Sequence, residues 1–221
     1  MKKLNFGRFT TFGFCVAFLM LALAAHATAQ KEERRMDVPE PQPSETVKTS
    51  IEKVKTFSGS AVIPYAGASL SRDKAGVFST IYTSGLTPGT VVTFWWAIFN
   101  NARACATPSC APPDLNNPDV KGSLQYGGGL VVGAEGRVDF GGYLEFGDNT
   151  GFYLLPQFPL MPNPAPGVVN TKGAVIHLVI RTHGAASPDP FILNQQLTTF
   201  PGGCSVTPNP CANIQAAQFV P

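Results

Sequence analysis

The most restrictive feature of this sequence is the run TVVTFWWAIFN over residues 90–100, which is apolar on both faces of an extended chain. Successive side chains of a strand point to opposite faces of its sheet. One face of this run would therefore carry Val92, Phe94, Trp96 and Ile98, and the other Val91, Trp95 and Phe99. A strand with two apolar faces belongs in the interior of a sheet. The run predicts a central strand.

From about Phe57 onward, short apolar runs alternate with turn signals rich in Gly and Pro. This pattern predicts an all-β fold, namely an antiparallel β-sandwich of immunoglobulin-like or jelly-roll-like type. We expect strands over residues 59–65, 76–83, 90–100, 122–126, 130–133, 137–146, 174–182 and 213–220. At most one short helix is expected, over residues 190–197, where Phe191, Ile192 and Leu197 would cover one end of the sandwich.

The N-terminus has the three parts of a secretory signal peptide: the basic start MKKLNFGR, an apolar run over residues 12–25, and small residues with the A-x-A sites AHA and ATA. The apolar run is shorter than the roughly 20 residues that span a bilayer. No later segment is longer and equally apolar. We expect a signal peptide over residues 1–29, cleaved at the second site, no transmembrane segment afterwards, and a secreted or periplasmic protein.

Residues 30–56 are charged and carry prolines, as in KEERR and DVPEPQPSE. Such a segment has little apolar surface to bury, and its prolines favour extended conformations. It predicts a flexible linker, followed by a single domain over residues 57–221. Within the linker, Val47, Ile51 and Val54 recur at helical spacing, which indicates one or two turns of amphipathic helix.

Charge in the mature chain argues against nucleic acid as a partner. The leader carries three of the 16 basic residues, so 13 remain against 14 acidic residues and the net charge becomes −1. A nucleic-acid surface would show clustered Lys and Arg. We expect no nucleic-acid partner, and the sequence identifies no other partner.

Four cysteines remain after the leader, which takes Cys15 with it. An even number in an exported chain indicates two disulfides. Three pairings are possible, and close spacing among Pro and Gly favours Cys105 with Cys110 and Cys204 with Cys211. Neither pair has the C-x₂-C spacing of a zinc ribbon, so we expect no metal site and no cofactor.

The strand over residues 174–182 has one polar face. Ile176, Leu178 and Ile180 alternate with His177 and Arg181, and His183 follows just beyond the strand on the polar side. Two imidazoles and a guanidinium suit an anionic ligand, so these three residues are binding candidates. The structural alternative is a satisfied, partly buried His177, an Arg181 paired with an acidic neighbour, and a His183 that caps the turn. At about 20 Å apart on an extended strand, the two histidines are too distant to share a metal ion.

The sequence offers little support for four further kinds of site: a sugar-stacking tryptophan, a calcium loop, a glycosidase pair and a known catalytic motif. Trp95 or Trp96, but not both, is a candidate for sugar stacking, because adjacent residues of a strand face opposite ways. The loop DLNNPDV gathers oxygen ligands of the kind calcium takes but lacks the EF-hand order. Asp139 and Glu145 would lie about 20 Å apart on one strand, beyond the separation of a glycosidase pair. No hydrolase, zinc-protease or phosphate-loop motif is present.

Several segments together resemble a family of uncharacterised secreted bacterial proteins: GLTPGTVVTFWWAIFNN, a cysteine pair followed by DLNNPDV, GAVIHLVIRTHG, QLTTFPGGC and CANIQAAQF. The resemblance spans residues 76–220 and implies no established activity. Members often carry a histidine near the C-terminus, where this chain reads QFVP. The turn GLTPGT is also similar to a corner of fibronectin type III domains, although Val92 stands where those domains usually have tyrosine.

These features favour a non-enzymatic exported β-sandwich that binds a partner or has a structural role at the cell envelope or in the extracellular space. The catalytic residues of an enzyme cannot be named from the sequence. The alternatives are a hydrolase with an unrecognised site and a carbohydrate-binding module.

Overall fold

The computed structural model describes residues 47–59, 61–205 and 208–221. The chain divides into two compact units between Gln42 and Pro43, and all described residues belong to the C-terminal unit. The predicted signal peptide and residues 30–46 of the predicted linker lie outside the described residues. Among the residues that are described, no helix is long and apolar enough to cross a membrane.

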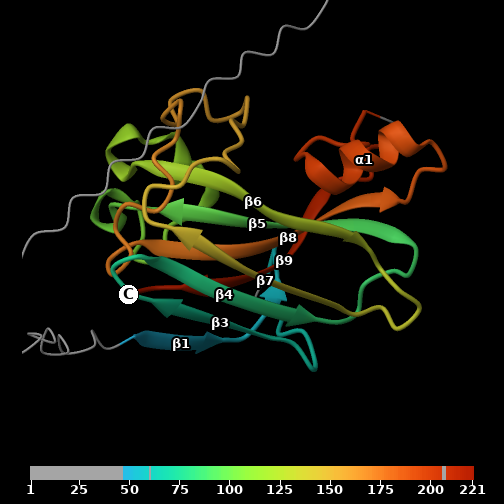
Figure 1. The fold of residues 1–221 in the computed structure, drawn as a ribbon, viewed down its shortest axis with the longest axis horizontal. Helices are drawn as coiled ribbons and strands as arrows, with labels where there is room; N and C mark the ends of the chain where they lie inside the picture. The colour runs from blue at the N-terminus through green and yellow to red at the C-terminus, as the bar shows by residue number, and fades with distance from the viewer. Residues whose placement is uncertain (1–46, 60, 206–207) are drawn as a thin grey trace, which may run out of the picture. The chain divides into compact units, whose positions relative to one another are not determined.

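The described chain forms two antiparallel sheets that face each other as a β-sandwich (Figure 1). The four-stranded sheet has the order β1-β3-β4-β7, with bounds β1 Lys48–Glu52, β3 Gly67–Arg72, β4 Gly76–Thr83 and β7 Val138–Glu145. The five-stranded sheet has the order β2-β9-β8-β5-β6, with bounds β2 Lys55–Thr56, β9 Ala212–Phe219, β8 Val175–Ala185, β5 Thr90–Phe99 and β6 Gly122–Val131. The predicted all-β antiparallel sandwich is confirmed.

The main core lies between the two sheets. Leu70, Ile81 and Phe140 of the four-stranded sheet pack in one cluster with Phe94 and Ile180 of the five-stranded sheet. These residues alternate along their strands with residues of the opposite face, as a period of two requires. Burial of this surface from water is the main term that holds the sheets together.

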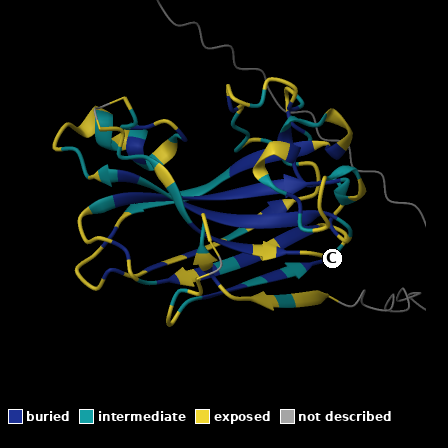
Figure 2. Cartoon of the chain, turned by 180° about the vertical axis from the view of Figure 1, so that it is seen from behind, coloured by how far each residue is buried: buried dark blue, intermediate teal, exposed yellow. Residues whose placement is uncertain are grey.

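A second core covers the outer face of the five-stranded sheet. Trp95, Ala97 and Phe99 of β5 pack there with Val179 of β8 and with residues of the long loops, including Leu115. In Figure 2 the middle strands are dark blue along most of their length, as strands covered on both sides should be. Strand β5 lies between β8 and β6, so the predicted central strand is confirmed.

The domain begins earlier than the sequence indicated. Residues 48–52 form β1, which pairs with β3, and residues 55–56 form β2, which pairs with β9. The predicted helix around Val47, Ile51 and Val54 is therefore wrong. Only Val54 is buried, while Ile51 is exposed on an edge strand. The backbone groups of β1 are satisfied by pairing with the free edge of β3. The helical spacing of three apolar residues carries no information about such an edge.

Two strand predictions also change. Of the strand predicted over residues 59–65, the described residues 59 and 61–65 form no strand; Val62 makes only an isolated bridge to Lys55, and Tyr65 has a positive φ of 53° after Pro64. Residues 122–126 and 130–133, predicted as two strands, belong largely to the single strand β6. A register shift opposite Phe94 and Trp95 accommodates its glycines.

The helix α1 (Pro190–Thr198) is the only α-helix of the described residues and matches its prediction. Asp189 caps it by accepting hydrogen bonds from the backbone N–H groups of Phe191 and Ile192. The helix packs against β5 and β6. Phe191 was expected to cover the sandwich, but it is 67% exposed, so it does not.

Candidate binding pocket

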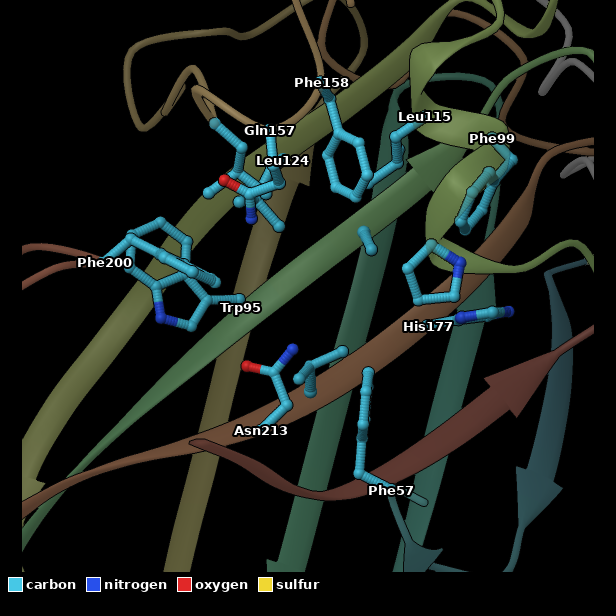
Figure 3. Close-up of a pocket in the computed structure, with 14 residues that line it drawn as sticks. Phe57, Trp95, Phe99, Leu115, Leu124, Gln157, Phe158, His177, Phe200 and Asn213 are labelled. Carbon is cyan, nitrogen blue, oxygen red and sulfur yellow. The ribbon is translucent and has the colours of Figure 1, made fainter. Parts of the chain in front are cut away.

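A partly open apolar pocket of about 200 Å³ lies on the outer face of the five-stranded sheet. Its floor consists of side chains from the central strands, among them Trp95 and Phe99 of β5 and Val179 of β8. Figure 3 shows the rings of Phe57, Phe158 and Phe200 arranged around this floor. These rings come from three loops far apart in the sequence, so the pocket exists only in the folded chain.

Trp95 is part of the pocket floor rather than an exposed platform. It is 1% exposed, and its ring packs edge to face against Tyr126, Tyr153 and Phe200. Flat stacking of a sugar on Trp95 is therefore not possible without displacing these rings. Trp96 projects into the core between the sheets, as the alternation predicts.

His177 is the one histidine among the residues that line the pocket. Its Nε2 lies 2.8 Å from the carbonyl oxygen of Ser109. Because a carbonyl only accepts, Nε2 carries the proton and Nδ1 is an acceptor. Burial lowers the pKa of His177 below its usual value, although the bond to Ser109 opposes this shift. The pocket wall is therefore neutral at His177 near pH 7.

Arg181 organises the pocket wall. Its guanidinium lies 4.0 Å from the centre of the Phe200 ring, its Nε donates to the Phe200 carbonyl at 2.9 Å, and its Nη1 donates to Asn213 Oδ1 at 3.1 Å. The expected acidic neighbour on an adjacent strand is not among these contacts. Since Phe200 and Asn213 both line the pocket, Arg181 positions two of its walls.

His183 does not line the pocket and is fully buried. Its Nδ1 donates to the Gly202 carbonyl at 2.7 Å, and its Nε2 accepts from the Thr93 hydroxyl at 2.8 Å. That hydroxyl in turn accepts from Trp95 Nε1 at 2.7 Å. The expectation that His183 caps a turn is wrong, because it is the centre of a buried network.

The network keeps His183 neutral. Burial lowers the pKa of His183 to about 4; the bond to Gly202 opposes the shift and the charge of Arg181 reinforces it. A second proton, on Nε2, would deprive the Thr93 hydroxyl of its acceptor. Both effects favour the uncharged ring.

Both predicted disulfides are present, Cys105 with Cys110 and Cys204 with Cys211. Each has a possible metal-ligating side chain nearby, Asp114 for the first pair and His183 for the second. Asp114 is engaged by the backbone, since its carboxylate accepts from the N–H groups of Ala106 and Ala111. The sulfurs are bonded to each other, so neither group offers a thiolate to a metal ion.

The oxygens of the DLNNPDV loop are used in local structure. Asn117 Oδ1 accepts from the Asp119 N–H at 3.0 Å, and Asn116 Oδ1 accepts from the Leu160 N–H at 2.9 Å. These bonds fix the loop against residue 160, beside the pocket wall. They favour a structural role of the loop over a calcium site.

Sequence reasoning found Trp95, His177 and Arg181 but missed the aromatic walls, namely Phe57, Phe158 and Phe200. The only signal was the apolar outer face of β5, which required some covering segment. Nothing in the local sequence of the three phenylalanines indicates that they converge. No protein-family model, curated protein or solved structure matches the chain.

Proposed function

We propose that this chain is an exported, non-enzymatic binding protein whose pocket on the outer face of the five-stranded sheet holds a small apolar molecule. The signal-like N-terminus and the two disulfides support export. The family of secreted bacterial proteins that the chain resembles is consistent with it. The location, secreted or periplasmic, is part of the proposal.

The observation that carries the proposal is the composition of the pocket. Its walls are aromatic and aliphatic, and its few polar side chains include His177, Asn213 and Gln157. Small-molecule sites are typically apolar with a few placed polar groups. Asn213 Oδ1 is engaged by Arg181, so its amide N–H groups are the donors available to a ligand. We infer a ligand with an apolar body and one acceptor.

A hydrolase fits the histidines poorly. His183 does contact a hydroxyl, that of Thr93, but Thr93 is fully buried and its oxygen also accepts from Trp95. A substrate carbonyl would have no access to it. The ring proton of His177 is directed to Ser109, and a backbone carbonyl is no nucleophile.

Tryptophan fluorescence tests the proposal directly. The chain has two tryptophans, so a Trp96→Phe variant leaves Trp95, at the pocket floor, as the sole reporter. Titration with small aromatic and aliphatic probes should change its emission saturably. Ala97 lines the pocket, so Ala97→Phe should fill it and weaken binding. Ala185→Phe, an equal change at an exposed end of β8, is the control. Equal binding by both variants would reject the pocket as the site.

A carbohydrate-binding function is a second candidate, favoured by a different surface. Phe78, Tyr82 and Tyr143 project from the outer face of the four-stranded sheet and are each about half exposed. Tyr82 lies across Gly67, where an added Cβ would be 2.6 Å from its hydroxyl, and Tyr143 lies across Gly76 in the same way, at 2.7 Å. Rings laid over glycines keep one face open to solvent, as sugar stacking requires.

A further inference from the structure

A second cleft, of about 330 Å³, lies on the side of the sandwich where the edge strands β6 and β7 face each other. It is lined by Gln125 and Gly127 of β6, Gly142 of β7, the loop residues Asp148 and Gly151, and the ring of Trp96. Trp96 faces the space between the sheets, whereas Trp95 faces the apolar pocket. The two sites therefore lie on opposite faces of the five-stranded sheet.

Gln125 carries an unpaired acceptor in this cleft. Its side chain is fully buried, and its Nε2 donates to Ser123 Oγ at 2.6 Å. Its Oε1 has no hydrogen-bond partner. Buried polar atoms are nearly always paired, because an unpaired one loses its hydration without compensation. We therefore expect Gln125 Oε1 to accept a hydrogen bond from a donor outside the described residues.

Two glycines of the cleft lining border this oxygen and the ring of Trp96. A Cβ added at Gly151 would lie 3.5 Å from Gln125 Oε1, and one added at Gly142 would lie 2.7 Å from the Trp96 ring. A side chain at either position would occupy the cleft or collide with its wall. The unpaired Oε1 thus lies next to Gly151, a residue of the cleft lining, and the cleft is also bounded by the ring of Trp96.

The charges around the cleft favour a cation. Asp148 lines it, and the described lining contains no lysine or arginine. An acceptor, a carboxylate and the aromatic ring of Trp96 together are the surroundings that stabilise an ammonium group.

We propose that this cleft binds a small organic cation through a primary ammonium group. One N–H of the ammonium donates to Gln125 Oε1, its charge is balanced by Asp148, and its alkyl part lies against Trp96. This site is independent of the apolar pocket, since the two share no lining residue. Either proposal can fail without the other.

The test uses isotope-labelled mature protein and three small probes of similar size: propylammonium, propan-1-ol and propionate. Propylammonium should shift the side-chain amide resonances of Gln125 and the backbone amides of Gly142 and Gly151, whereas the alcohol and the anion should not. Added salt should weaken the interaction, because one partner is a carboxylate near the surface. If the partner of Gln125 Oε1 is only a buried water, none of the probes should cause a shift, and that result would overturn the proposal. Equal shifts with propylammonium and propionate would overturn it as well.

Variants locate the site. Gln125→Leu should weaken propylammonium binding roughly tenfold or more, because the acceptor is lost. Gln218→Leu, the same change at an exposed position of β9, should leave it unchanged. If Gln125→Leu does not fold, Asp148→Asn and Gly151→Ala decide: the first removes the counter-charge and the second fills the space before Oε1. Unchanged binding by these variants would overturn the proposal.

Discussion

Arg181 holds Phe200 at two points, with its guanidinium 4.0 Å above the ring and its Nε bonded to the carbonyl oxygen at 2.9 Å. One side chain thus fixes both the ring and the backbone of a residue that belongs to a loop. Because the ring is also a wall of the apolar pocket and packs on Trp95, the shape of the pocket depends on this contact.

Replacing Arg181 should therefore affect both stability and binding. Arg181→Lys loses the bond from Nε and the planar stacking over Phe200, and we expect a loss of about 1–2 kcal/mol in the free energy of unfolding. Binding of an apolar probe should weaken as the Phe200 wall loosens. Chemical denaturation and fluorescence titration measure the two effects. Arg103→Lys, at an exposed position, is the control, and equal behaviour of the two variants would contradict the assigned role.

Stability should depend on pH through His183. In the unfolded chain this ring takes up a proton near its usual pKa of 6.5, but in the folded protein only at about 4. The stabilisation that comes from this neutral ring is therefore fully present above about pH 6.5. It is lost as the pH falls from 6.5 towards 4. The total loss is on the order of 3 kcal/mol. Denaturation at several pH values measures it, and a His183→Gln variant should lack this part of the slope.

Loss of the two histidines should have unequal effects. His183→Ala leaves the Gly202 carbonyl and the Thr93 hydroxyl without their buried partner and creates a cavity, so we expect a cost of roughly 3 kcal/mol or more. His177→Ala removes one bond, to Ser109, and should cost about 1–2 kcal/mol. Thermal unfolding of the two variants compares them. A larger effect at His177 would show that the buried network matters less than its geometry indicates.

Breaking the Cys204–Cys211 disulfide should both lower the stability of the fold and loosen the apolar pocket. The loop is short, with a sequence separation of 7, so its entropic contribution is about 2–2.5 kcal/mol. The bridge ties the segment after Phe200 to the start of β9, so a Cys204→Ala/Cys211→Ala double variant should also bind apolar probes less tightly. The matched Cys105→Ala/Cys110→Ala variant has a comparable loop and should show the loss of stability with a smaller effect on Phe200. Melting curves and fluorescence titration distinguish the two.

The carbohydrate candidate has its own surface and its own variants. Tyr82→Ser and Tyr143→Ser remove exposed rings from the outer face of the four-stranded sheet and should abolish retention on any polysaccharide that the parent protein binds. Each change should have little effect on folding, since about half of each ring is already exposed. Affinity electrophoresis in polysaccharide gels measures retention. Binding that survives both changes would place the sugar site elsewhere.

The sequence alone determined the parts of this protein that depend on neighbouring residues. The two apolar faces of residues 90–100 predicted a central strand, because the side-chain period of a strand is two. The short helix expected over residues 190–197 corresponds to α1, and the close spacing of the cysteines, 5 and 7 residues apart, favoured the pairing that the structure has. Each of these signals needs only local geometry.

Tertiary structure decided which segments cover those faces. Residues 48–52 and 55–56 became strands only because the edges of β3 and β9 offered backbone partners. Phe57, Phe158 and Phe200 form one pocket only through contacts between residues distant in the chain, and the same holds for the burial of the unpaired Gln125 Oε1. Such contacts follow from the packing of whole sheets and loops, and many loop arrangements satisfy the same local pattern. Burial, pairing and pKa are therefore properties of the assembled fold.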